Sequence, residues 1–246
     1  MKSAYQTVLV AASGLLMVLT TNLQAKETKI RLQDKTEIVG IVSGDIRSDS
    51  TALMLHQCNR DQSMWGPLVG NLIREGVSVL TVDMRGYGRS ESKKYKISDQ
   101  SWLEITEHFA KDLVDIDQHW RQLTPKANKR ILVGASCGGG LSLSNAANHN
   151  DIDALVLLSP SIRERWTSSQ DKELFKSKSE TPVLGIASEE DKNALKSIEQ
   201  VFEWSRSKDS QKIVYKGRMH GEPLFNYDSQ LPETIVRWIK RVTADK

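Results

Sequence analysis

The sequence lacks the features that mark several large classes of protein. Its 246 residues contain only two cysteines and five histidines, and these do not fall at the spacings of a zinc site. It has no GxxxxGK motif to cradle the phosphates of a nucleotide and no basic block with interleaved aromatic residues. Cationic and anionic side chains nearly balance, with a formal net charge of +3. We therefore expect no cofactor, no metal and no nucleic-acid partner.

The first 25 residues differ in character from the rest. Lys2 is followed by an apolar run over residues 8–19 and then by a polar stretch that ends at Ala25. This order, with Leu23 and Ala25 where a signal peptidase inspects the chain, is typical of a secretory signal peptide over residues 1–25. A membrane anchor is the alternative, but the run is shorter than the roughly 20 residues that a spanning helix needs. We expect an exported protein, periplasmic or secreted, without stable membrane insertion after signal removal.

Residues 26–246 show the pattern of one α/β domain. Residues 28–44 alternate around a turn-like "QDKT" and predict an antiparallel hairpin. Short apolar segments then alternate with helical periods, the clearest of which span residues 105–123 and 235–242. The pattern predicts a mostly parallel central sheet with helices on both faces and an active site beyond the carboxyl ends of its strands. The predicted strands are 51–57, 77–83, 130–136, 153–160, 182–188 and 211–217.

The segment "GASCG", residues 134–138, places a hydroxyl and a thiol between glycines at the end of a predicted strand. It fits G-x-S-x-G, a strand-to-helix turn so sharp that the flanking positions tolerate almost no side chain. Cys137 as the nucleophile would put Ala135 where the first glycine belongs. We therefore expect Ser136 to be the nucleophile, and the alternative is a glycine-rich helix start without a catalytic role.

A second motif lies upstream, in "LMLHQCNRDQSMWGPLVGNLIREGVSVLTVDMRGYGRS", which ends in D-x-R-G-x-G-x-S over residues 83–90. With the serine motif, this stretch resembles the α/β-hydrolase superfamily of serine hydrolases, and the resemblance runs from about Thr51 to Val242. It is similar to esterases and dienelactone hydrolases without a large cap domain, although the latter carry cysteine where this chain has Ser136. The resemblance implies the α/β-hydrolase fold and a triad in the chain order serine, acid, histidine.

A serine nucleophile needs a general base, and in this fold the base follows the last strand. His220 is the one histidine at that point of the chain. The alternative is an exposed histidine without a catalytic role. The acid should follow the predicted strand 182–188, where Glu189, Glu190 and Asp191 all lie. By the resemblance Asp191 fits best and would hold the histidine tautomer, while the register of a short loop leaves the two glutamates open.

The resemblance also implies two backbone N–H donors for an oxyanion. One would be the N–H group of Cys137, directly after the nucleophile. The other would come from His56-Gln57-Cys58, where relatives show His-Gly-x. Because Gln57 replaces the glycine, Gln57 and Cys58 are both candidates, with Cys58 preferred, and His56 is expected to be a structural hydrogen-bonding residue.

Cysteines that both flank one oxyanion would lie near each other. An export signal would bring them to a compartment where a disulfide persists. We expect a disulfide between Cys58 and Cys137 that braces the oxyanion hole. The alternative is a pair of free thiols that shape the acyl pocket.

These features predict an exported serine hydrolase, namely a carboxylesterase that cleaves small or medium acyl esters through an acyl-enzyme on Ser136. Residues 160–181 hold no predicted element and are too few for a large lid, and Trp65 and Trp166 are expected to wall the acyl pocket. The same triad would also serve a thioesterase, a lactone hydrolase or a peptidase. Gln57 leaves open a catalytically silent binding protein of this fold. The expected partner is a small-molecule ester, and the sequence carries no signal for an oligomeric state.

Overall fold

An eight-stranded sheet runs through the computed structural model, which describes residues 25–98, 101–178 and 180–244. The strand order is β1-β2-β4-β3-β5-β6-β7-β8. The first two strands form the predicted antiparallel hairpin, β2 pairs antiparallel with β4, and all other pairs are parallel. Residues 1–24, which hold nearly all of the predicted signal peptide, lie outside the described residues. The strands are β1 (Lys26–Arg31), β2 (Glu37–Ser43), β3 (Ser50–Leu55), β4 (Val77–Asp83), β5 (Lys129–Ala135), β6 (Ala154–Leu158), β7 (Val183–Ser188) and β8 (Gln211–Tyr215).

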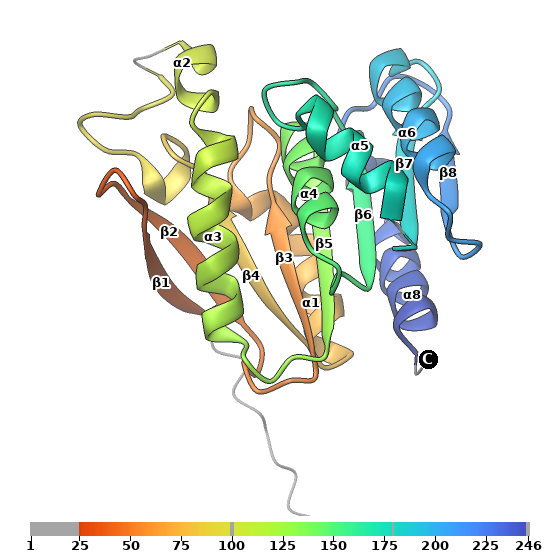
Figure 1. Cartoon of the computed structure of the whole chain (residues 1–246), viewed down its shortest axis with the longest axis horizontal. Coiled ribbons are helices and arrows are strands. Elements are labelled where there is room, and N and C mark those ends of the chain that lie inside the picture. The colour runs from red at the N-terminus through yellow and green to blue at the C-terminus, as the bar shows by residue number, and fades with distance from the viewer. Residues whose placement is uncertain (1–24, 99–100, 179, 245–246) are drawn as a thin grey trace, which may run out of the picture.

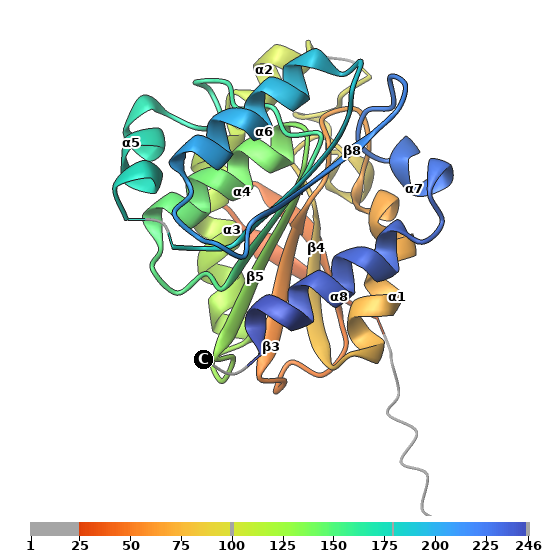
Figure 2. The same cartoon turned by 90° about the vertical axis from the view of Figure 1, so that its right-hand side faces the viewer.

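Helices cover both faces of the sheet, as the sequence predicts (Figures 1 and 2). One face carries α1 (Gly66–Arg74), α7 (Pro223–Tyr227) and α8 (Leu231–Thr243). The other carries α3 (Phe109–Leu123), α4 (Cys137–Asn148), α5 (Ser169–Lys178) and α6 (Lys192–Trp204). Two short 3-10 turns, η1 (Gln62–Trp65) and η2 (Gly88–Ser90), and the one-turn helix α2 (Trp102–Thr106) lie in the connections.

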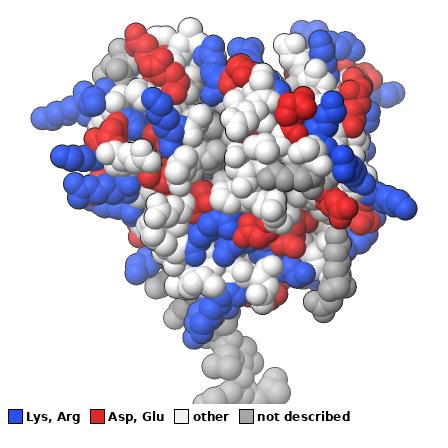
Figure 3. Space-filling view, in the orientation of Figure 1, with Lys and Arg blue, Asp and Glu red and all other residues white. Residues whose placement is uncertain are grey.

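The central strands are apolar on both sides because each face of the sheet packs on helices. In β3, Leu53 and Leu55 enter the core beneath α3 and α4, whereas Ala52 and Met54 enter the core beneath α1 and α8. The outer surface is charged instead, and Figure 3 shows cationic and anionic side chains interspersed over the face of α3, α4 and α5. None of the helices in the described part of the chain is long and apolar enough to span a bilayer.

Two helical regions differ from the sequence prediction. The period over residues 105–123 is not one helix: α2 ends at Thr106 and α3 begins at Phe109. Ile105 and Phe109 nevertheless bury in the same core, so the apolar spacing survives the break. The segment 160–181, where no element is predicted, contains α5, whose residues Ser169–Lys178 are mostly polar and give little amphipathic signal.

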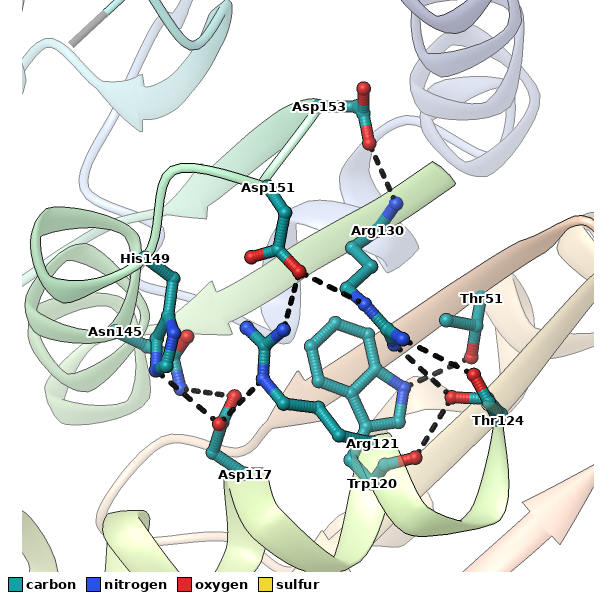
Figure 4. A network of polar contacts seen from close by, with 10 residues as sticks. All are labelled: Thr51, Asp117, Trp120, Arg121, Thr124, Arg130, Asn145, His149, Asp151 and Asp153. Atoms are coloured by element: carbon teal, nitrogen blue, oxygen red, sulfur yellow. Dashed lines mark hydrogen bonds and ion pairs between the residues drawn. The ribbon is translucent and has the colours of Figure 1, made fainter. Parts of the chain in front are cut away.

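A polar network holds together the end of the sheet where β3 and β5 begin (Figure 4). The indole N–H of Trp120 in α3 donates to the hydroxyl of Thr51 at 2.9 Å. Arg130, at the start of β5, donates to the side chain and carbonyl of Thr124 at 3.2 Å each and pairs with Asp151 at 3.3 Å. These contacts tie the carboxyl end of α3 to the first residues of β3 and β5.

A buried ion pair anchors the loop after β4. The Arg85 guanidinium binds the carboxylate of Asp112 in α3 through two hydrogen bonds, at 2.9 and 2.6 Å, and both side chains are buried. A third bond, at 2.6 Å, reaches the more exposed Asp34 in the β1–β2 turn. Burial raises the pKa of Asp112 despite these bonds, whereas the hydrogen bond from Arg85 holds the pKa of Asp34 well below its usual range. Arg85 thus joins the hairpin, α3 and the β4 loop.

We predict that Arg85→Ala lowers the free energy of unfolding by about 3–5 kcal/mol, because it leaves the Asp112 carboxylate buried without a partner. The matched control is Arg47→Ala, which cuts the pair with Asp45 between side chains that are 76% and 49% exposed and should change stability little. Urea unfolding of both variants measures the difference. Equal losses would contradict the assigned role of the buried pair.

Candidate active site

Ser136 occupies a strained turn between β5 and α4. Its backbone lies at φ 51° and ψ −116°, a region that residues with a side chain rarely adopt. The Ser136 N–H group donates to the carbonyl of Leu158 at 3.0 Å, and the Ser136 carbonyl accepts from the N–H group of Ser161 at 2.9 Å. Both backbone polar groups of Ser136 are therefore bonded to the last residue of β6 and to the segment that follows it.

The glycines on either side of Ser136 are required by close backbone approach. A Cβ atom on Gly134 would lie 2.2 Å from the carbonyl oxygen of Gly138. A Cβ atom on Gly138 would lie 2.2 Å from the carbonyl oxygen of Leu55, at the end of β3. The turn predicted from the serine motif is present, and α4 points its N-terminal end at Ser136.

His220 and Asp191 meet beyond the carboxyl ends of β8 and β7. The Nδ1 atom of His220 lies 2.6 Å from Oδ2 of Asp191. The other carboxylate oxygen of Asp191 accepts from the N–H group of Ala194 at 3.4 Å and so caps α6. Glu190 instead pairs with Arg218 at 3.3 Å, and no contact joins Glu189 to His220 in the described residues. Of the three acids left open by the sequence, Asp191 is the one beside the histidine.

Ser136 and His220 line the same cavity, which has a volume of about 730 Å³. Its apolar wall consists of Tyr87, Ile97 and Trp102. The remaining lining residues are Cys58, Asn59, Arg60, Asp61, Gly88 and Glu91. No cluster of three or more histidine, cysteine or acidic residues that could hold a metal occurs in the described ranges.

The expectation that Trp65 and Trp166 wall the pocket is wrong, because neither lines this cavity. Trp65 ends η1 and turns into the core on the α1 and α7 face, where it meets the ring of Phe225 edge-on at 6.2 Å. Trp166 is buried behind Trp102, with ring centroids 6.4 Å apart. The sequence prediction does not include Trp102 as a pocket residue, because in the sequence it only lies near the start of a helix. Its position between β4 and α3, at the carboxyl edge of the sheet, is the signal that points to it.

The loop after β3 brings the backbone of Cys58 to this cavity. The Gln57 N–H group donates to the sulfur of Met64 at 3.5 Å. The N–H groups of Cys58 and Cys137 make no hydrogen bond within the described residues. Of the two candidates left open in the loop, Cys58 is the one with a free N–H group.

The side chains of Tyr87 and His56 hold the loop after β3 in place through hydrogen bonds. The hydroxyl of Tyr87 donates to the carbonyl of Cys58, and burial raises the pKa of Tyr87 to about 12. The Nε2 atom of His56 accepts from the N–H group of Met84 at 2.9 Å, so its Nδ1 carries the proton that bonds the Gln57 carbonyl at 2.8 Å. Burial lowers the pKa of His56, which keeps the ring neutral. His56 has the structural role expected of it.

A disulfide joins Cys58 to Cys137, with the two Cα atoms 5.8 Å apart. The described residues contain no free cysteine. The predicted disulfide is confirmed, and it links the loop after β3 to the first residue of α4.

The disulfide closes a loop with a sequence separation of 79, for which the chain-entropy model gives about 4.5 kcal/mol of stabilisation. We predict that reduction lowers the free energy of unfolding by up to that amount. Intact mass after alkylation tests the bond itself: no thiol should be alkylated without reductant and two should be alkylated with it. Two alkylated thiols without reductant would rule the bond out.

No curated protein matches the chain. Among solved structures, an esterase from Pyrococcus furiosus superposes with a TM-score of 0.70 at 16% identity, covering 90% of this chain and 92% of that one. A dienelactone hydrolase from Anabaena variabilis gives 0.68 at 15% identity (89% and 98%). An esterase from Exiguobacterium antarcticum gives 0.65 at 18% identity (87% and 99%).

These structures share the fold of the chain. The sequence match is to a family model described as serine aminopeptidase, S33, and it covers residues 47–178, which include the loop after β3, the β4 motif and Ser136. By this match and its fold, the chain belongs to the serine aminopeptidase S33 family of α/β-hydrolases.

Proposed function

We propose that the protein is a carboxylesterase that forms an acyl-enzyme on Ser136. The observation that carries the proposal is the hydrogen bond between His220 and Asp191 at the edge of the cavity that Ser136 lines. The Ser136 hydroxyl attacks the ester carbonyl while His220 takes its proton and then passes it to the leaving alcohol. Asp191 holds the proton on Nδ1 of His220, which leaves Nε2 to act as the base. Water, activated in the same way, releases the acid.

The oxyanion of each tetrahedral intermediate would be bound by the backbone N–H groups of Cys58 and Cys137. Both groups lack a protein partner in the described residues, and the disulfide fixes the distance between their residues. The N-terminal end of α4 adds a favourable dipole at the same point. Donors held in place before the reaction are worth more than donors that must reorient.

The cavity supports small or medium esters as substrates. Its volume is about 730 Å³, and Tyr87, Ile97 and Trp102 offer an apolar wall to an acyl chain or ring. No residue of α5 is among the lining residues, so α5 forms no wall of the cavity. Thioesters and lactones would use the same steps and belong in the same substrate panel.

The second candidate is an aminopeptidase, which the family description favours. Asp61 and Glu91 line the cavity, and a carboxylate there would suit the free amino group of a peptide. Rates on aminoacyl p-nitroanilides and on p-nitrophenyl esters discriminate the two activities. We expect the esters to be turned over and the anilides to react far more slowly.

We further propose that the protein is exported, periplasmic or secreted, with residues 1–25 removed as a signal peptide. The disulfide between Cys58 and Cys137 supports this, because such bonds persist in oxidising compartments. The intact mass of the exported protein tests it: the chain should begin at Lys26, and a product that retains residues 1–25 would contradict it.

We predict that Ser136→Ala and His220→Ala each abolish nearly all ester hydrolysis without unfolding the protein, because nucleophile and base act as one unit. Asp191→Asn should lower kcat by on the order of 10⁴, since it would impose the wrong tautomer on His220. The matched control is Glu190→Gln, at the residue directly before Asp191, which pairs with Arg218 and should keep the wild-type rate. Wild-type protein that turns over no ester would favour the catalytically silent alternative, and a near-normal Asp191→Asn enzyme would displace the acid.

A further inference from the structure

Gln57 stands where similar hydrolases have glycine, and its side chain is buried. The amide oxygen of Gln57 accepts a hydrogen bond from the N–H group of Glu222 at 2.8 Å. Its amide nitrogen donates to the side-chain oxygen of Asn59 at 2.6 Å. One side chain thus joins the loop after β3 to the loop after β8, across 165 residues of sequence.

The backbone next to His220 has a second anchor and is shaped to receive this amide. The N–H group of Gly221 donates to the hydroxyl of Ser159 at 3.0 Å. Gly221 lies at φ +68°, and a Cβ atom there would lie 1.9 Å from the amide oxygen of Gln57. The glycine therefore gives Gln57 room to reach the Glu222 N–H group.

These bonds matter because little else holds His220. Its side chain is 42% exposed, and its one hydrogen bond in the described residues is that to Asp191. The two residues that follow it are held by Ser159 and Gln57, and Arg60 from the loop after β3 adds an ion pair to the carboxylate of Glu222. The base and the loop that bears the Cys58 N–H group are consequently tied together.

We propose that Gln57 is a positioning residue that holds His220 in register with the loop after β3, so that the general base and one oxyanion donor keep a fixed relation. The inference rests on the proposed function of Ser136 and His220. It assigns a role to the residue that, from the sequence, is only a departure from the family pattern. The side chain acts through Glu222 and Asn59, and Gln57 is not among the residues that line the cavity.

The test is Gln57→Met, which keeps the length of the side chain and removes both hydrogen bonds of its amide group. We expect kcat on a p-nitrophenyl ester to fall about 10- to 100-fold with KM nearly unchanged, because small displacements of catalytic groups act on the chemical step. Gln57→Glu keeps an oxygen for the Glu222 N–H group and should recover most of that loss. If Gln57→Met does not fold, Gln57→Asn, one methylene too short to reach Glu222, takes its place with the same expected loss.

The matched control is Gln62→Met, which also removes two hydrogen bonds of a side-chain amide. Gln62 donates to Asp83 at 2.9 Å and accepts from Thr81 at 2.6 Å, and neither bond reaches the His220 loop. Its kcat should stay near wild type. A readout independent of turnover is the downfield proton resonance of the His220 to Asp191 hydrogen bond, which should broaden or shift in Gln57→Met and not in Gln62→Met.

Wild-type kcat and an unchanged resonance in Gln57→Met would overturn the inference, and so would equal losses in Gln57→Met and Gln62→Met. Failure of the proposed function looks different: the wild type then hydrolyses no ester, while the resonance still reports whether Gln57 holds His220.

Discussion

The site depends on how closely the first turn of α4 approaches the end of β3. At Gly138 even a Cβ atom would lie 2.2 Å from the carbonyl oxygen of Leu55, so the two backbones are in direct contact. His56, Gln57 and Cys58 follow Leu55 at once, and Cys137 precedes Gly138. This single approach therefore brings Cys58 beside Cys137, the residue after Ser136, and allows the disulfide between them. The N–H groups of both cysteines have no hydrogen-bond partner in the described residues. A larger residue at position 138 would separate the two loops.

The surrounding contacts preserve that approach, because the loop after β3 has no strand neighbour to fix its backbone. The D-x-R-G-x-G-x-S motif supplies several of them. Its Asp83 carboxylate accepts from the N–H group of Arg89 at 2.9 Å, its Arg85 reaches the hairpin and α3, and its Tyr87 hydroxyl donates to the carbonyl of Cys58. The motif marks the fold in sequence because it shapes the loop that the disulfide joins to the residue after Ser136.

The sequence predicts the parts of the molecule that follow from local pattern. Buried parallel strands are apolar along their whole length, so β3 to β7 are found within a few residues of their true ends, and chain order alone puts Ser136, Asp191 and His220 after strands. The parts it misses depend on tertiary contact. A tryptophan is apolar wherever it lies, so the sequence could not tell that Trp65 packs in the core and Trp166 stands behind Trp102. Glu222, the partner that joins Gln57 to the loop after β8, lies 165 residues along the chain, and no spacing in the sequence indicates it.

The central claim is that Ser136 is an activated nucleophile, and a fluorophosphonate probe tests it most directly. The probe reacts with a serine hydroxyl only when a base and oxyanion donors activate it, so it needs no knowledge of the substrate. Intact mass and peptide mapping of the treated protein should give one adduct, on Ser136, which is absent in Ser136→Ala and retained in Ser161→Ala. No adduct on the folded wild-type protein, or an adduct on another residue, would contradict the account.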